Sequence, residues 1–216
     1  MCQIKEHHSG IVRYWDAVAA RYCELFRDEL QSKPYDLNVL NAFATSVGRG
    51  ARVCDVGCGP CAHVTRYLAD QGLDMVGIDL SAVCVALARR EQPSLQFFRM
   101  DMGTMAFRED SFDGLVAYYA LHYQPKSTLD AVIREFARIL RPGGKLLVVV
   151  KEGNGEGWIP DPLGSGQQVF WCAFTPSEVQ SLLANNGFQI VSSDVREPLP
   201  DEIRVRRIYV SAQRTL

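Results

Sequence analysis

The stretch Val53-Cys54-Asp55-Val56-Gly57-Cys58-Gly59 decides the fold class of this chain. Its first half belongs to the short apolar run 51–56, which is typical of a buried strand, and its second half opens a glycine-rich turn. Glycine adopts positive φ without strain and lets a ligand approach the backbone closely. Residues 62–70 then predict a helix, whose first amides can bind an anion such as a carboxylate or a phosphate. A strand, a glycine turn and a helix in this order indicate one unit of a ligand-binding α/β sheet.

The same alternation continues on the C-terminal side of the turn. Helices are predicted over residues 81–90 and 129–140, and strands over 73–78, 95–99, 112–118 and 145–150. Short joints between such elements are typical of βαβ units, which build a parallel sheet. Ligands of these sheets bind beyond the carboxyl ends of the strands. We therefore expect an α/β fold with a doubly wound, mostly parallel sheet and helices on both of its faces.

The flanking regions predict further elements of the same domain. Amphipathic patterns predict N-terminal helices over residues 11–31 and 36–47, whereas the glycine-rich segment 151–172 is interpreted as a long loop. A capping box, Thr175-Pro176-Ser177-Glu178, then begins a helix. The last two predicted strands are joined by a proline-containing loop and no helix, so we expect an antiparallel pair at residues 188–195 and 207–212.

Composition and charge exclude several classes of protein. The 216 residues are 47% hydrophobic and 22% charged, ordinary values for one globular domain. The net charge of −2 offers no basic excess for binding a phosphate backbone, so we expect no nucleic-acid partner. No apolar run approaches the ~20 residues that a membrane span needs, and the first residues lack the apolar core of a signal peptide. With seven cysteines, an odd number, we expect mostly free thiols and a cytoplasmic location.

Three acidic residues, Asp55, Asp79 and Asp101, stand at or near the ends of successive predicted strands. Asp79 follows Gly59 by 20 residues, which is the place and the residue type that bind a ribose diol. The glycine pattern also fits a dinucleotide fingerprint, but a pyrophosphate beside Asp55 would suffer like-charge repulsion. S-adenosylmethionine has no phosphate, and nearby carboxylates favour its ammonium and sulfonium charges. The acids therefore favour S-adenosylmethionine over a dinucleotide.

Five ordered segments give residues 53–151 a resemblance to the class I S-adenosylmethionine-dependent methyltransferases. The segments are Asp55-Val56-Gly57-Cys58-Gly59-Pro60, Gly77-Ile78-Asp79-Leu80-Ser81, Met100-Asp101-Met102, Phe112-Asp113-Gly114 and Leu140-Arg141-Pro142-Gly143-Gly144. The resemblance implies a Rossmann-like sheet of seven strands with an antiparallel last strand. It also implies the cofactor S-adenosylmethionine and its product S-adenosylhomocysteine.

The resemblance further implies which residues hold the cofactor. Gly57 and Gly59 would approach its methionine part, and Asp79 would accept the ribose hydroxyls. Asp55 is also expected among the cofactor-binding residues. The other expected contacts are Leu80 packing on adenine, Asp101 accepting from the adenine amino group, the Met102 amide beside it, and Tyr118 flanking the ligand.

Two features of the same site depend on neighbouring segments. Tyr14 and Tyr22 lie eight residues apart on the first helix, which in related enzymes folds over the cofactor; plain core packing is the alternative. Cys61 stands where the family usually has glycine. We expect its β-carbon to crowd the methionine carboxylate or to shift the turn.

His122 is the candidate catalytic residue, because it lies just beyond the strand 112–118 at the rim of the expected site. An imidazole there could act as a general base near neutral pH, and a structural or substrate-packing role is the alternative. Cys54, Cys58 and Cys61 have the spacing of a radical S-adenosylmethionine iron–sulfur motif. Cys54 falls within a strand, however, and cluster ligands need a pliable loop, so we expect no metal site.

The sequence thus predicts a methyltransferase acting on a small-molecule acceptor, as a monomer or a homodimer. We divide its single domain into an N-terminal helical cap, a cofactor-binding core, a lid-like loop, and a C-terminal helix with the closing strands, at residues 1–48, 49–151, 152–174 and 175–216. Three alternatives stay open. The chain could bind the cofactor without transferring methyl, as a regulatory or cyclase-like protein; it could be a nicotinamide-dependent oxidoreductase; or it could methylate a thiol or metalloid using its own cysteines.

Overall fold

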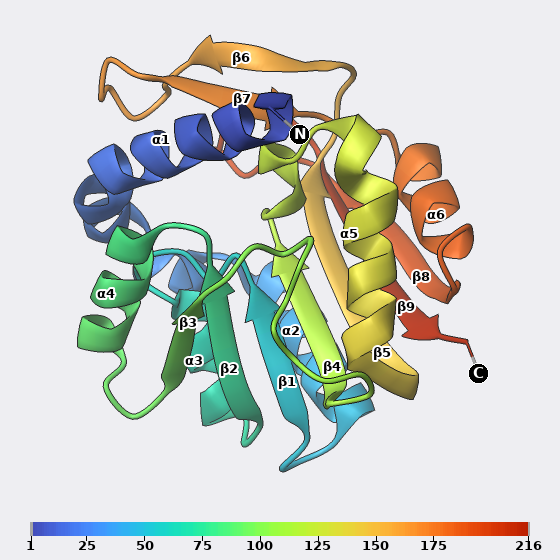
Figure 1. The fold of residues 1–216 in the computed structure, drawn as a ribbon. Helices are drawn as coiled ribbons and strands as arrows, with labels where there is room; N and C mark the ends of the chain where they lie inside the picture. Colours follow the sequence, from blue (N-terminus) through green and yellow to red (C-terminus); the bar gives the residue numbers. More distant parts are fainter. Residues whose placement is uncertain (1, 216) are drawn as a thin grey trace.

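A seven-stranded sheet forms the centre of the computed structural model, which describes the backbone of residues 2–215 and the side chains of residues 6–215. The strand order is β3-β2-β1-β4-β5-β9-β8 (Figure 1). The bounds are β1 Arg52–Val56, β2 Asp74–Asp79, β3 Gln96–Arg99, β4 Phe112–Tyr118, β5 Leu140–Lys151, β8 Phe188–Arg196 and β9 Arg207–Arg214. The first five strands pair in parallel, and β9 is antiparallel to both β5 and β8. The predicted sheet and its antiparallel last strand are confirmed.

Helices cover both faces of this sheet (Figure 1). Their bounds are α1 Cys2–Phe26, α2 Pro34–Val47, α3 His63–Asp70, α4 Ala82–Glu91, α5 Lys126–Ile139 and α6 Pro176–Ala184, with short 3-10 helices η1 Glu29–Ser32 and η2 Leu121–Tyr123. The helices α5 and α6 pack on one face, and α2 and α3 pack on the other. This arrangement is the doubly wound architecture that the alternating pattern predicts.

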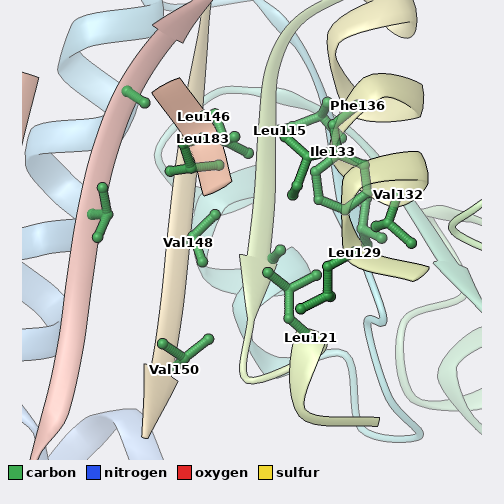
Figure 2. Packing of buried hydrophobic residues seen from close by; sticks show 14 of the residues in the cluster. Leu115, Leu121, Leu129, Val132, Ile133, Phe136, Leu146, Val148, Val150 and Leu183 are labelled. Atoms are coloured by element: carbon green, nitrogen blue, oxygen red, sulfur yellow. The ribbon is translucent and has the colours of Figure 1, made fainter. Parts of the chain in front are cut away.

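The run 146–150 in β5 shows how the sequence builds this core. Its side chains alternate between the faces: Leu146, Val148 and Val150 pack toward α5 and α6, and the two between them pack toward α2 and α3. Figure 2 shows these three side chains on β5 near the apolar stripe of α5, which includes Ile133 and Phe136. All five residues of the run are fully buried, which is why this part of the strand is apolar at every position.

Local signals start two of the helices where the sequence predicts them. The Ser81 hydroxyl accepts from the Cys84 amide at 3.0 Å and caps α4. The Thr175 hydroxyl accepts from the Glu178 amide at 3.2 Å, while the Glu178 carboxylate accepts from the Thr175 amide at 2.7 Å. This reciprocal pair is the predicted capping box of α6.

The segment 151–172 differs from the predicted long loop, because it forms a β-hairpin. Strands β6 Glu156–Pro160 and β7 Gln168–Cys172 pair in antiparallel fashion. Val169 is buried against Tyr14 and Val18 of α1, and Cys172 is buried in the main core. These contacts are made with distant parts of the chain, so they leave no local signal in the sequence. The glycines and prolines of the segment, taken alone, predict a loop. In Figure 1 the hairpin and α1 lie together beyond the carboxyl ends of β1, β2 and β4.

Within residues 2–215, no helix combines the length and the apolar character that crossing a membrane requires.

Candidate active site

A pocket opens at the carboxyl ends of β1, β2 and β4, beneath α1. The space between its walls, open mouth included, is about 750 Å³. Its walls come from the glycine turn, the ends of the strands, α1 and η2. The lining residues are Ile11, Trp15, Tyr22, Asp55, Gly57, Cys58, Gly59, His63, Val64, Asp79, Leu80, Met102, Tyr118, Tyr119, Ala120, Tyr123 and Gln124. Most of the predicted cofactor-binding residues are therefore brought together.

The glycine turn forms the floor of the pocket with the conformation that the sequence predicts. Gly57 and Gly59 have positive φ, at +76° and +65°. A β-carbon on Gly57 would lie 2.6 Å from the Ala120 β-carbon, so this position accepts only glycine. A β-carbon on Gly59 would meet nothing within 4 Å. The backbone of the turn thus lies open to a ligand at Gly59.

Asp79 holds the turn from the end of β2. Its carboxylate accepts the Gly59 amide at 3.1 Å and the Ser81 amide at 2.9 Å. Burial raises the pKa of this carboxyl to about 6, although the amide hydrogen bonds work in the opposite direction. A carboxylate can accept about four hydrogen bonds, so hydroxyl donors of a ligand can still reach it.

Asp55 lies deeper, at the end of β1. It is fully buried, and its carboxylate accepts the Thr65 hydroxyl at 2.6 Å. Burial raises the pKa of Asp55 to about 6. A cationic group of a ligand in the pocket would therefore stabilise the ionised form of Asp55.

Aromatic side chains close the pocket from above. Trp15 lies edge-on to Tyr22 and to Tyr123, with ring centroids 5.2 and 5.3 Å apart. The Ser81 hydroxyl donates to the Asp16 carboxylate at 2.5 Å, which joins α1 to the loop that follows Asp79. Of the two predicted tyrosines of α1, Tyr22 lines the pocket, and Trp15 and Tyr123 are lining residues that sequence reasoning missed.

Two predicted cofactor residues do not line the pocket. Tyr14 is buried against Val18 and Val169, because eight residues of helix turn through about 800°, which sets Tyr14 some 80° away from Tyr22. Asp101 instead faces the start of α1, where its carboxylate lies 3.3 Å from His8 Nδ1 and also accepts the Gly103 amide at 2.9 Å. In this structure Tyr14 and Asp101 are therefore not placed where the resemblance expects them, at the wall of the pocket.

The prediction that His122 acts as a general base is also wrong for this geometry. Its ring is fully buried; Nδ1 lies 2.6 Å from the Cys172 carbonyl oxygen, and Nε2 accepts the Lys151 amide at 2.8 Å. The ring stacks on Trp171 with centroids 4.1 Å apart, and burial lowers the pKa of His122 to about 3. Because both nitrogens are engaged by backbone groups, no lone pair is free to take a proton from a substrate. His122 is a structural residue that joins η2 to β5 and β7.

Cys61 is not among the residues that line the pocket, and its thiol contacts His63. Its sulfur lies 3.3 Å from His63 Nδ1, and His63 Nε2 lies 2.9 Å from the Glu29 carboxylate. His63 is buried and lines the pocket, so it is a site residue that the sequence did not reveal. Its only sequence signal is its place at the start of the helix after the glycine turn.

Cys54 and Cys58, two cysteines of the iron–sulfur spacing, lie in different parts of the core. Cys54 is buried in the main core, whereas Cys58 packs with Val85, Ala88 and Phe97. Among the residues that the structure describes, no group of histidine, cysteine and acidic side chains could hold a metal ion. The six cysteines with described side chains are buried free thiols.

The chain is similar in sequence to methyltransferases. Residues 53–144 match the family model of a methyltransferase domain. The chain is 32% identical over 160 residues to a demethylmenaquinone methyltransferase of Beutenbergia cavernae, covering 73% of this chain and 64% of that protein. It is 37% identical over 98 residues to a malonyl-[acyl-carrier protein] O-methyltransferase of Enterobacter lignolyticus, covering 45% of this chain and 38% of that protein. The chain thus spans between 38% and 64% of the length of these two relatives.

The fold is also that of a solved methyltransferase. An S-adenosylmethionine-dependent methyltransferase from Methanosarcina mazei superposes with a TM-score of 0.73 at 21% identity, covering 81% of this chain and 97% of that one.

Proposed function

Because the chain belongs to the class I S-adenosylmethionine-dependent methyltransferases, we propose that it transfers the methyl group of S-adenosylmethionine to a small-molecule acceptor. In this reaction an acceptor atom forms a bond to the methyl carbon, the carbon–sulfur bond breaks, and S-adenosylhomocysteine leaves. The sulfonium is already a good leaving group, so the protein mainly supplies proximity and orientation. The observation that carries the proposal is the position of the Asp79 carboxylate. It lies beside the open glycine turn, in a pocket that the rings of Trp15 and Tyr22 cover.

The pocket supports one orientation of the cofactor. Asp79 would accept the ribose hydroxyls, and Leu80 and Met102 would enclose the adenine. Gly59 would let the methionine part approach the turn, and the buried charge of Asp55 would favour its ammonium. The methyl group would then point toward the end of β4, where Tyr118 and its neighbours form the wall. Trp15, Tyr22 and Tyr123, whose rings lie over the pocket, would reduce the access of water to the reacting atoms.

The net charge and the names of the relatives support a small molecule as the acceptor. The net charge of −2 offers little attraction for a nucleic acid. Several relatives are named for demethylmenaquinone, which supports an organic small-molecule acceptor. We propose that the hairpin β6–β7 acts as the lid over this side, because Trp158 and Ile159 remain exposed on it. We further propose a cytoplasmic location, which the buried free thiols support, and a monomer or homodimer.

Calorimetry with S-adenosylmethionine and S-adenosylhomocysteine tests the cofactor assignment. We expect micromolar dissociation constants, about −8 kcal/mol, and at least tenfold weaker binding by Asp79→Ala. Unchanged affinity in that variant would refute the role of Asp79. Methyl transfer itself is tested with deuterium-labelled cofactor, as described at the end of the Discussion.

A further inference from the structure

A buried ionic cluster lies behind Tyr118 and Tyr119, next to the pocket. It combines the cations Lys33, Arg196 and Arg207 with the carboxylates Glu29, Asp36 and Glu202, each at most 11% exposed. Every one of these charges has an opposite charge close by. Lys33 lies 2.5 Å from Glu29, for example, and Arg207 lies 3.3 Å from Glu202. The cluster is therefore internally neutral, before His63 is counted.

Lys151, at the end of β5, is the exception in this region. Its ammonium lies 5.2 Å from the centroid of the Tyr119 ring and 5.0 Å from that of Trp171. Among the side chains that the structure describes, no carboxylate lies within 4.0 Å of it, although its neighbours in the cluster are all paired. Lys151 thus adds one positive charge that has no carboxylate in direct contact, and the two ring faces are its nearest stabilising groups.

The titration of Lys151 agrees with this isolation. Burial lowers the pKa of its ammonium to about 8, and the positive charges of Arg207 and Lys33 lower it further, while Glu29 and Glu202 raise it. At neutral pH the ammonium is still mostly protonated. It can therefore donate hydrogen bonds to an anion.

Tyr119 connects this charge to the pocket. Its ring lines the pocket, and its hydroxyl is buried without a hydrogen-bond partner. The nearby Tyr209 hydroxyl already donates to Asp36 at 2.9 Å and accepts from Arg196 at 3.0 Å. The backbone of Tyr119 adopts φ +58°, which is strained for a tyrosine, and its amide donates to Val149 at 2.8 Å. Burial raises the pKa of Tyr119 to about 12, so its hydroxyl stays a donor.

We propose that Lys151 and the Tyr119 hydroxyl bind an acidic oxygen of the acceptor, a carboxylate or an ionised hydroxyl, at the end of the site opposite the cofactor. Such an oxygen would accept from both groups and would neutralise the one unpaired charge. Trp171 of β7 would form the far wall. This inference rests on the proposed function and deepens it, because it names the chemical class of the acceptor.

The first test uses 4-nitrophenol as a probe, because its ionised form is yellow. The protein is first saturated with S-adenosylhomocysteine, and the colour of the bound probe is followed against pH. We expect the bound probe to ionise about one pH unit lower than the free probe, and Lys151→Met to abolish this shift and weaken binding at least ~10-fold. Tyr119→Phe should weaken binding of the probe, because it removes one of the two donors to the ionised oxygen. Neutral nitrobenzene should bind more weakly than the phenolate.

Several outcomes of this test would overturn the proposal. They are equal probe binding by the wild type and Lys151→Met, nitrobenzene binding as tightly as the phenolate, and no saturable binding of the probe. A protein that fails to bind S-adenosylhomocysteine in calorimetry would refute the proposed function instead, and this result is read before the probe is added.

Thermal unfolding without ligand gives a second, independent test. Lys151→Met removes a positive charge that has no carboxylate in direct contact and keeps the packing on two rings, so the Tm should rise. Lys33→Met is the matched control, since it leaves Glu29 without its closest cation and should lower the Tm. A drop in Tm with Lys151→Met as large as that with Lys33→Met would show that Lys151 is a structural residue, and would refute the proposal.

Discussion

Replacing Asp79 by asparagine is the perturbation whose effect the structure defines most closely. The carboxylate accepts from Gly59 and Ser81 and would also accept two ribose hydroxyls. Hydrogen bonds to a charged acceptor contribute about 1.5–3 kcal/mol each. The asparagine oxygen can still accept, but the amide nitrogen faces donors. We therefore expect a loss of about 2–3 kcal/mol, which weakens binding of S-adenosylhomocysteine about 30- to 150-fold.

The pH dependence of binding gives this prediction a second readout. Burial raises the pKa of Asp79 to about 6, and bound hydroxyl donors favour the ionised form, so the ligand lowers this pKa again. Binding then takes up no proton above about pH 7 and requires proton release below pH 6. We expect affinity to be constant above pH 7 and to fall up to about tenfold per unit below pH 6. In Asp79→Asn the fall below pH 6 should be shallower, because only Asp55 then remains to be ionised by the ligand.

Isothermal calorimetry between pH 5 and 8, at roughly unit steps, measures both effects. Asp74→Asn is the matched control, because Asp74 is an exposed residue at the opposite end of the same strand. Binding by Asp79→Asn within twofold of the wild type, or an equal pH profile in both proteins, would refute the assignment of Asp79.

Three further predictions address the other site residues. His122→Ala leaves the Cys172 carbonyl and the Lys151 amide without partners, so it should lower the Tm by about 10 °C in calorimetry, while turnover of the folded enzyme changes only a few-fold; a large loss of turnover at unchanged Tm would restore a catalytic role. Tyr22→Ala should weaken S-adenosylhomocysteine binding about tenfold in a fluorescence titration, whereas Tyr14→Ala should mainly lower the Tm; the reverse pattern would contradict the positions of these rings. Cys61→Ala should bind S-adenosylhomocysteine within about twofold of the wild-type affinity, because the thiol contacts His63. A marked loss of affinity would indicate that the thiol contacts the ligand.

The sequence could predict the parts of this protein whose signals are local. The run 146–150 is apolar at every position, so it predicts a strand buried on both faces. Gly57 and Gly59 predict the open turn, because their conformations strain other residues. Asp79 is predicted by its spacing from that turn. Each of these signals lies within one strand–turn–helix unit.

The remaining features depend on contacts between distant segments. The hairpin β6–β7 is stabilised by α1, and nothing within its own glycine-rich sequence indicates this packing. His122 looks like a base until Cys172 and Lys151 are placed against its two nitrogens. The isolation of Lys151 can be recognised only once the surrounding charges have been paired. Tyr14 shows a different error, since a spacing of eight residues departs far enough from the helical repeat to point it elsewhere.

The central claim is that this chain transfers methyl from S-adenosylmethionine to a small molecule. The most direct measurement is mass spectrometry of a small-molecule extract after incubation with the protein and methyl-deuterated S-adenosylmethionine. We predict a labelled small molecule that forms together with S-adenosylhomocysteine, and neither product above background with Asp79→Ala. If cofactor is bound but no labelled small molecule forms, or if Asp79→Ala forms the same product at the same rate, the claim is contradicted.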